Sequence, residues 1–291
     1  MLCIVGTVPD DRFTLTQGTV ELQGNELRIG QASVGVNRGT AALLAAAATA
    51  AAVLKQPAPS ACLVGDTGNG KGSRKLYRHM IDVLPQKAFQ TITLHYLQPL
   101  IHWHKKMQAV IGDLTPRPCL IADAGFMYVA KMSGEAALYD LFTPDVGELA
   151  FLADEEAPHP FYTRGFILHE NNRVPDLIAR AYRHNNAARY LIVKGEKDYL
   201  ADASGILETV DHPVEEVLEA IGGTGDTLTG LVSVLIDAGM SVREAAVAAM
   251  RTNRLAGQRA KPTPATQIGD IIRHIPRALE AVLSECGRQA E

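Results

Sequence analysis

The chain has 291 residues, a formal net charge of -4 and a sequence pI near 6.1. This slightly acidic balance argues against a nucleic-acid-binding protein, which usually presents a basic face. Hydrophobic residues make up 47% of the chain and charged residues 21%, as in globular proteins with a substantial core. The length admits one large or two small domains. Because the sequence has no internal repeat, long polar linker or change of composition, we expect one domain over residues 1–291.

The cysteines and the apolar runs limit the class of protein further. Four cysteines lie far apart without C-x-x-C spacing, so we expect neither a zinc knuckle nor a disulfide framework. The longest apolar run, from Ala41 to Leu54, is shorter than a membrane span and mostly alanine, which predicts a buried helix. The N-terminus lacks the pattern of a secretory signal. We therefore expect a cytoplasmic protein that binds neither membranes nor nucleic acid.

Strand and helix patterns alternate along the chain. Leu2–Val5 and Gly18–Leu22 predict short antiparallel strands, with a turn at Gly24 and Asn25 before a third strand. After the alanine helix, apolar strands at 61–64, 91–94 and 119–122 are each followed by a helix, near 74–83, 100–111 and 134–141 respectively, and further strands are expected at 190–193 and 199–201. Apolar strands that alternate with helices predict a mostly parallel sheet with helices on both faces.

Polar residues follow several of these predicted strands directly. Gly65 and Asp66 follow the strand at 61–64, Asp123 follows the strand at 119–122, and Lys194 with Gly195 follows the strand at 190–193. In open α/β sheets, ligands bind outside the carboxyl ends of the strands. The sequence therefore predicts a ligand site at this edge of the sheet.

The most informative segment is the glycine-rich run from Gly222 to Gly230, which contains Asp226. It precedes an apolar stretch that ends at Gly239, a pattern typical of a glycine turn that opens a buried helix. Backbone N–H groups at such a positive helix end bind phosphate. A carboxylate in the first turn is also a common cap for free N–H groups. Capping alone requires neither the crowded glycines nor the upstream Lys194–Gly195 pair.

Three other segments invite a chemical interpretation. Gly65–Ser73 has the pattern G-x-x-x-x-G-K of a phosphate-binding P-loop, but Gly72 stands where a hydroxyl would bind magnesium, which favours a substrate loop or a strand-to-helix turn. His102 and His104 lack an evident third metal ligand, so a structural role is favoured. Asp145 and Glu148 have the spacing of a helix capping box.

The segments Thr143–Glu148, Val193–Gly195 and Gly222–Asp226 occur in the order and approximate spacing seen in the ribokinase-like superfamily. The C-terminal third is most similar to the ADP- or ATP-dependent NAD(P)H-hydrate dehydratases, and Pro264–Ile272 resembles the segment before that family's last helix. The resemblance runs from about Pro118 to the C-terminus. It implies a three-layer ribokinase-like α/β fold over the whole chain.

The N-terminal part departs from the dehydratase pattern. The family's G-P-G-L-G loop has no clean counterpart, although Gly39–Leu44 resembles its small-residue helix. Val64–Gly72 instead resembles the G-D-x-G loop of sugar kinases. Asp145 also stands where the dehydratases carry a histidine.

The resemblance implies roles for individual residues. Asp226 would be the catalytic base, and Glu148 would place Mg²⁺ through water. The nucleotide would be bound by Lys194, Gly195, Gly222, Gly223, Thr224 and Gly225. The substrate would be bound by Asp145, Asp123, Gly65, Asp66 and Asn37.

The first function that follows is dehydration of hydrated NADH or NADPH, driven by ATP or ADP with Mg²⁺. The alternative is an ATP-dependent kinase for a sugar, nucleoside or vitamin alcohol, because one anion site serves both reactions. A third hypothesis is a nucleotide-binding sensor without turnover. We expect a homo-oligomer with a small-molecule substrate.

Overall fold

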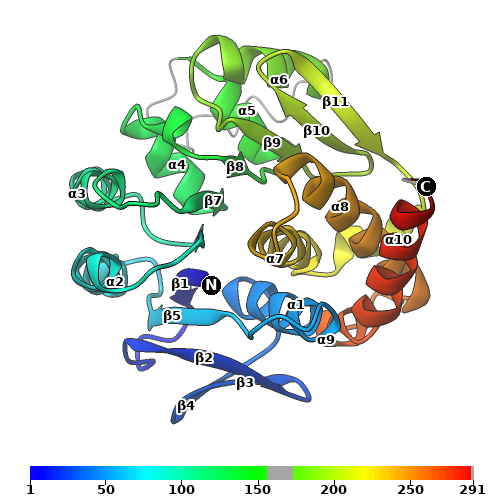
Figure 1. Cartoon of the computed structure of the whole chain (residues 1–291), viewed down its shortest axis with the longest axis horizontal. Helices are drawn as coiled ribbons and strands as arrows, with labels where there is room; N and C mark the ends of the chain where they lie inside the picture. Colours follow the sequence, from blue (N-terminus) through cyan, green and yellow to red (C-terminus); the bar gives the residue numbers. More distant parts are fainter. Residues whose placement is uncertain (156–172, 290–291) are drawn as a thin grey trace. The chain divides into compact units, whose positions relative to one another are not determined.

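The computed structural model describes residues 1–155 and 173–289 (Figure 1). The contacts within the chain divide it into two compact units. The first unit comprises Met1–Ile4, Thr16–Leu63 and Val210–Glu291, and the second comprises Val5–Leu15 and Val64–Thr209. Strands β1 (Leu2–Val8) and β5 (Ser60–Gly65) each begin in the first unit and end in the second. A single ribokinase-like domain over 1–291 stays a prediction.

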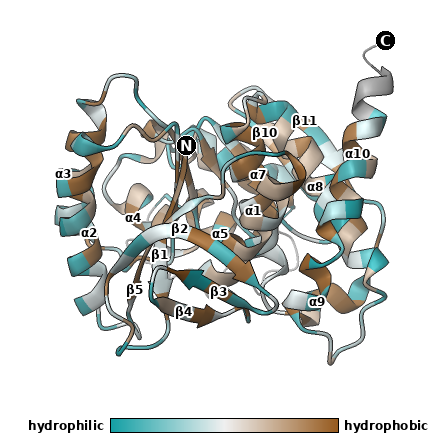
Figure 2. Ribbon diagram, turned by 60° about the horizontal axis from the view of Figure 1, so that its bottom comes forward, coloured by the Kyte–Doolittle hydropathy of each residue, from teal (hydrophilic) through white to brown (hydrophobic). Residues whose placement is uncertain are grey.

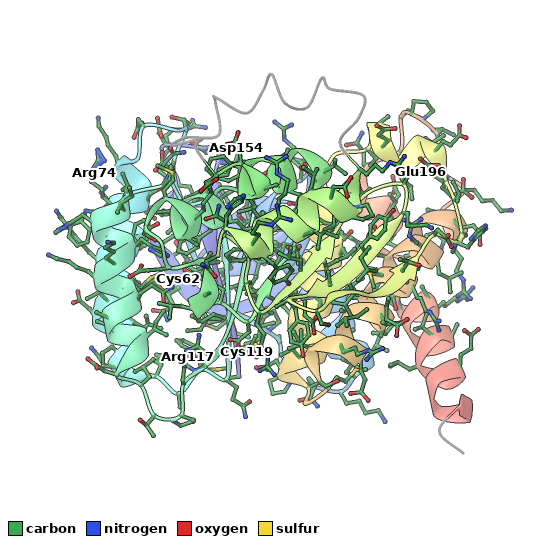
Figure 3. All side chains as sticks on the ribbon, turned by 90° about the horizontal axis from the view of Figure 1, so that it is seen from above. Cys62, Arg74, Arg117, Cys119, Asp154 and Glu196 are labelled. Carbon is green, nitrogen blue, oxygen red and sulfur yellow. The ribbon has the colours of Figure 1, made fainter. Side chains whose placement is uncertain are left out.

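The second unit is built on parallel strands, as the sequence predicts. The strands lie in the order β11 (Gly205–Val210), β10 (Asp198–Asp202), β9 (Tyr190–Val193), β8 (Leu141–Phe142), β7 (Cys119–Asp123), β6 (Thr91–His95) and β1. Pairs from β6 to β9 are parallel, and β10 is antiparallel to β9. Because their residues are apolar on both faces, the parallel strands are almost completely buried. Their carboxyl ends share one edge of the sheet. In Figure 3, Arg117 and Cys119 at the amino end of β7 lie well away from Glu196, which follows β9.

Most helices of this unit are amphipathic, with one buried face and one exposed face. They are α2 (Lys71–Val83), α3 (Ile101–Gly112), α4 (Gly125–Met132), α5 (Val146–Ala153) and α6 (Val174–Arg183), with short 3-10 turns η1 (Leu84–Gln86) and η2 (Ala136–Leu138). In α2, the residues Leu76, Tyr77 and Met80 are buried at helical spacing, and Figure 2 shows this helix banded in hydrophilic and hydrophobic colours. Such an amphipathic stripe packs one face of a helix onto the core.

The helix expected near 134–141 is wrong. The strand β7 is followed by α4, which ends at Met132, and Gly134 with a φ of 74° turns the chain back after it. Gly134 donates its backbone N–H to the carbonyl of Lys131, so this glycine ends a helix. Leu141, which the prediction put at the helix end, forms the short strand β8 with Phe142.

The first unit contains an antiparallel meander. Strand β2 (Thr16–Gln23) pairs with β5 on one side and with β3 (Glu26–Ile29) on the other, and β3 pairs with β4 (Ala32–Gly35). The register places Gln23 opposite Glu26, with Gly24 at a φ of 61° in the turn. The predicted hairpin around Gly24 and Asn25 is therefore confirmed.

Helices complete the first unit. They are α1 (Thr40–Val53), α7 (Thr224–Asp237), α8 (Val242–Arg259), α9 (Ile268–Ile272) and α10 (Ile275–Gln289), with the 3-10 turn η4 (Glu216–Ala220). The alanine-rich α1 is buried on nearly all sides, as predicted, and lies beside α7 (Figure 1). A Cβ atom on Gly230 would overlap the carbonyl oxygen of Leu43. Backbone therefore meets backbone between these two helices, which only small residues permit.

No helix in the described part of the chain is long and apolar enough to cross a membrane.

Candidate active site

The glycine turn at the start of α7 has the conformation that the sequence predicts. Gly223 has a φ of 105°, and a Cβ atom on it would lie 2.9 Å from Cγ1 of Ile268. Both the backbone conformation and the packing therefore require glycine at this position. The N–H groups of the first turn have no acceptor within the helix, and they lie at its positive end. The structure thus gathers Gly222–Gly225 into one turn that suits an anion.

Asp226 lies in the first turn of α7 and contacts a second helix start. Its Oδ2 accepts a hydrogen bond of 2.7 Å from the backbone N–H of Gly39, the residue that precedes α1. Asp226 therefore links the first turn of α7 to the N-cap residue of α1. Two positive helix ends favour negative charge on this carboxylate, which is the form that accepts a proton.

A hydrogen-bonded pair behind the turn fixes its geometry. Asn253 of α8 donates from Nδ2 to the carbonyl oxygen of Thr224 at 3.0 Å, and its Oδ1 lies 2.7 Å from Oγ1 of Thr227. Thr227 is fully buried. These contacts connect α7 to α8 close to Asp226. They join residues far apart in the sequence, so the local sequence does not predict them.

Asn37, which the sequence placed in the substrate site, lies in the same unit. It is exposed two residues before Gly39, at the entrance to α1. Its neighbour Arg38 packs beside the glycine turn, since a Cβ atom on Gly222 would lie 3.6 Å from Cδ of Arg38. The structure therefore brings Asn37 near the start of α1, in the unit that also carries the Asp226 turn.

In the second unit, Asp123 and Lys194 form a buried ion pair at the carboxyl edge of the sheet. Nζ of Lys194, directly after β9, lies 2.9 Å from Oδ1 and 3.1 Å from Oδ2 of Asp123, the last residue of β7. His95, the last residue of β6, stands opposite Asp123 in the register, with Nε2 3.8 Å from Oδ2. All three side chains are largely buried, and the opposite charges of Asp123 and Lys194 are stable there because they are paired.

Two more predicted residues lie at the same edge. Asp145 forms a parallel bridge with Lys194, and the backbone N–H of Lys194 donates to the carbonyl of Pro144 at 2.8 Å. Gly195 donates its N–H to Oδ1 of Asp198 at 3.1 Å. The parallel strands thus bring Asp123, Asp145, Lys194 and Gly195 together, as expected from their positions after strand ends.

The predicted capping box at α5 is confirmed. Glu148 donates its backbone N–H to Oδ1 of Asp145 at 2.7 Å, and Asp145 donates its N–H to Oε2 of Glu148 at 2.9 Å. Glu148 is half-buried by exposed area, yet protein atoms crowd its carboxylate. Burial raises the pKa of Glu148 to about 8, with help from the charges of Asp145 and Asp123 and against the opposing effect of Lys194.

These carboxylates fit a magnesium ion. Carboxylate oxygens are the hard donors that Mg²⁺ prefers, and Mg²⁺ commonly keeps several waters between itself and the protein. Burial is the main cause of the raised pKa of Glu148, and the charges of Asp145 and Asp123 raise it further, so a divalent cation beside these carboxylates would favour their ionised form. The donor set therefore suits a cation held by Glu148 through water.

The loop Gly65–Ser73 is organised around the carboxylate of Asp66. Asp66 is buried and accepts hydrogen bonds from the backbone N–H groups of Gly68, Gly70 and Ser73 at 3.0, 3.0 and 2.8 Å, and from the Ser73 hydroxyl at 2.7 Å. Burial alone would raise the pKa of Asp66, but these hydrogen bonds lower it below its usual value. In a P-loop such N–H groups hold phosphate. Here a carboxylate of the chain takes them, so this segment is not a P-loop.

The glycines of this loop are needed for packing. A Cβ atom on Gly65 would overlap the carbonyl oxygen of Asp10, and one on Gly72 would overlap the carbonyl oxygen of Gly65. Gly65 and Asp66 therefore shape the strand-to-helix turn before α2. Their assignment to substrate binding stays a prediction.

Of the two histidines at the start of α3, His104 has the structural role that the sequence favoured. His104 is fully buried, with Nε2 2.7 Å from the Tyr139 hydroxyl and Nδ1 3.0 Å from the Ser133 hydroxyl. Its neighbour His102 is exposed. The two side chains thus lie in different environments.

Sequence reasoning missed His95 and Ala124 at the sheet edge. His95 could have been found, because it directly follows the predicted strand at 91–94, just as Asp123 follows its own. Ala124 has a φ of 50°, which is strained for a residue with a side chain, and no sequence signal reveals it.

Comparisons with known proteins show the family of the chain. Residues 102–277 match the carbohydrate kinase family model described as NAD(P)H-hydrate dehydratase. An uncharacterised protein of Methanocaldococcus jannaschii is 43% identical over 220 residues, which are 75% of this chain and 90% of that protein. The bifunctional NAD(P)H-hydrate repair enzyme of Pyrobaculum aerophilum is 28% identical over 141 residues, 48% of this chain and only 25% of the enzyme.

Solved structures show the fold. The ADP/ATP-dependent NAD(P)H-hydrate dehydratase of Bacillus subtilis, co-crystallised with ATP and Mg²⁺, has a TM-score of 0.57 at 15% identity, over 97% of this chain and 89% of that one. Phosphofructokinase-2 of Escherichia coli with fructose-6-phosphate has a TM-score of 0.52 at 14% identity, over 96% and 99%. The predicted ribokinase-like α/β fold is confirmed.

Proposed function

Since the chain belongs to the NAD(P)H-hydrate dehydratase family, we propose that it repairs hydrated NADH or NADPH by nucleotide-dependent dehydration. ATP or ADP donates its terminal phosphoryl group to the hydroxyl that hydration adds to the nicotinamide ring. The C–O bond then breaks, phosphate leaves, and loss of a proton from the neighbouring carbon restores the ring double bond. The products are the reduced dinucleotide, inorganic phosphate and the nucleotide with one phosphate fewer.

Asp226 is the proposed general base. It takes the proton of the substrate hydroxyl as the oxygen attacks phosphorus, a step for which general bases contribute about 10²–10⁴-fold. The N–H groups of Gly222–Gly225 hold the phosphates and stabilise the charge that develops during transfer. The observation that carries this assignment is the Asp226 carboxylate at the starts of both α7 and α1, beside the glycine turn.

Residues of the second unit have the remaining roles. Lys194 and Gly195 contact the nucleotide, while Asp123 and Asp145 contact the substrate. Glu148 would hold Mg²⁺ through water, and the ion would supply positive charge that neutralises the phosphates. The ion pair of Lys194 with Asp123 orients the lysine along the sheet edge.

The test is recovery of NADH from its hydrate. Purified protein is given hydrated NADH with Mg²⁺ and either ATP or ADP, and NADH absorbance and released phosphate are followed together. We expect both to rise in equal amounts with one of the nucleotides. Asp226→Asn is the matched inactive control. Absence of NADH recovery with either nucleotide contradicts the proposal.

The alternative is a small-molecule kinase. One difference from the dehydratase pattern favours it: Asp145 stands where the dehydratases carry a histidine. A carboxylate suits a sugar or alcohol hydroxyl, because it accepts a hydrogen bond from it. A kinase releases a stable phosphoester, which phosphorus NMR detects in a panel of sugars and vitamin alcohols. Accumulation of such an ester without NADH recovery would select the kinase.

Assembly and location stay predictions from the sequence. We expect a cytoplasmic homo-oligomer. Light scattering on the purified chain measures its oligomeric state directly, and a monomeric mass contradicts the first expectation.

A further inference from the structure

Tyr96 is an exposed aromatic side chain directly after strand β6. Its side chain is 48% exposed, whereas the residues on both sides of it, His95 and Leu97, are buried. Its backbone has a φ of 52°, a left-handed conformation that a bulky side chain rarely adopts. Glycine or asparagine would meet this conformation at lower cost. The chain therefore holds a tyrosine ring at the sheet edge against the preference of its backbone.

Specific contacts hold this strained residue in place. The Thr7 hydroxyl donates a hydrogen bond of 2.8 Å to the carbonyl oxygen of Tyr96. The Tyr96 ring meets the ring of His95 edge to face, with centroids 4.3 Å apart and an interplanar angle of 76°. His95 is fully buried, and its Nε2 lies 3.8 Å from Oδ2 of Asp123, so His95 connects the Tyr96 ring to the Asp123–Lys194 ion pair.

A second exposed apolar side chain flanks the same ion pair. Val146, 38% exposed, follows Asp145 after β8 and lies next to Gly195, where a Cβ atom would come within 3.7 Å of its Cγ2. The strand order is β6, β7, β8, so Tyr96 and Val146 follow the strands on either side of β7. Asp123 ends β7 between them. Apolar groups thus flank a charged centre, which suits a flat ring that carries a polar substituent.

We propose that Tyr96 is a positioning residue whose ring stacks on the nicotinamide-derived ring of the dinucleotide, with the ring's carboxamide toward Asp123. This inference rests on the proposed function, because that function supplies the ring. Tyrosine suits the role, since it offers a large flat surface with few rotatable bonds. The buried His95 beneath its edge limits ring rotation.

The test measures NADH binding by calorimetry together with KM and kcat on hydrated NADH. We expect Tyr96→Ala to weaken NADH binding and to raise KM about tenfold, in line with ring-stacking contributions, with kcat within about twofold of the wild type. Tyr96→Phe, which keeps the ring, restores both. Tyr190→Ala, at the amino end of β9 and thus at the opposite edge of the sheet, is the matched aromatic control and leaves both unchanged.

Tyr96→Gly separates binding from folding. Glycine accepts the positive φ, so this variant keeps or gains thermal stability while it loses the ring and the affinity for NADH. The inference is overturned if Tyr96→Gly binds NADH as tightly as the wild type. It is also overturned if the wild type binds neither NADH nor NADPH. A wild type that binds NADH through Tyr96 but does not dehydrate the hydrate leaves the inference intact and refutes the proposed function.

Discussion

At the residue scale, Asp226 joins two helix starts through one carboxylate. Its hydrogen bond to Gly39 gives it a measurable structural role that is separate from proton transfer. An asparagine at this position keeps the acceptor oxygen for Gly39 but cannot take a proton at neutral pH. The two roles can therefore be measured separately.

For Asp226→Asn we expect turnover to fall by about 10²-fold or more, because the amide cannot act as a base. Nucleotide affinity and thermal stability stay close to the wild type, since the Gly39 contact persists. Asp226→Ala removes the contact as well and costs about 1 kcal/mol of stability, as for other lost caps. Steady-state kinetics and calorimetry check these values, and near-normal turnover of Asp226→Asn would leave the residue only its capping role.

Glu148 gives the protein a specific dependence of stability on pH when magnesium is chelated. Its pKa is raised from 4.5 to about 8 in the folded chain, so the folded state binds more protons than the unfolded state between these values. The contribution to stability is fully present below pH 4.5 and is lost as pH rises through 8. Gln at this position mimics the protonated acid and still accepts the Asp145 N–H.

We therefore expect Glu148→Gln to unfold at a higher temperature than the wild type above pH 8, with the difference shrinking toward pH 5. Thermal unfolding in chelator across this range measures it. If the difference in unfolding temperature between the two proteins does not change with pH, burial does not raise the pKa of Glu148.

At the element scale, the sequence predicted most of the parallel strands and the starts of α1, α5 and α7, but not strand β8, the start of α4 or how the loops use their polar groups. The apolar runs before Asp123 and Lys194 predicted where these two strands end. The spacing of Asp145 and Glu148 predicted the helix capping box. The helix expected at 134–141 was wrong because Gly134 was treated as a start, whereas its positive φ ends α4. The bonds around Asp66 reach up to seven residues along the chain, beyond any periodic pattern.

The loop before α2 gives a prediction that separates it from a P-loop. We expect Lys71→Ala to leave nucleotide affinity within about twofold, since the loop N–H groups are already taken by Asp66 and Lys71 is exposed. Asp66→Ala, in contrast, leaves several buried N–H groups unsatisfied and costs about 1–3 kcal/mol. Nucleotide titration and thermal unfolding measure the two effects. Loss of nucleotide binding in a folded Lys71→Ala protein would restore the P-loop interpretation.

The close contact between α1 and α7 gives a further testable prediction. Gly230→Ala would place a methyl group against the Leu43 carbonyl oxygen, so the helices must separate, at a cost of about 1–3 kcal/mol. Because Gly39 and Asp226 lie one turn from this contact, we expect turnover to fall too. Gly112→Ala is the control, since a Cβ atom there meets nothing within 4 Å. Equal stability of the two variants contradicts the close helix contact.

At the scale of the whole molecule, the sequence predicted a ribokinase-like chain without its division into two units. Each unit is assembled from separate segments, and the boundaries fall inside β1 and β5. No linker, glycine run or composition change marks a boundary in the middle of a strand. Only contacts between residues far apart in sequence reveal it, and a single sequence does not contain them.

Nucleotide binding should stabilise the whole chain by mass action. At a nucleotide concentration of about 100 times Kd, we expect a gain of about 2.7 kcal/mol, seen as a higher unfolding temperature with ATP or ADP and Mg²⁺. Gly225→Val, whose branched side chain blocks the phosphate approach at the start of α7, removes this gain. A melting temperature that responds to nucleotide equally in both proteins would exclude the glycine turn as the phosphate site.

The Asp66 loop has a consequence for the kinetics of binding. Because the chain supplies its own anion to the loop N–H groups, the loop is preorganised before any ligand arrives. Ordering the backbone of a flexible loop on binding costs about 1–2 kcal/mol of conformational entropy per residue. This loop is already ordered in the folded chain, so ligand binding does not carry that cost. A ligand that docks beside this loop therefore meets a rigid wall, and its association rate is set by diffusion and orientation rather than by loop closure.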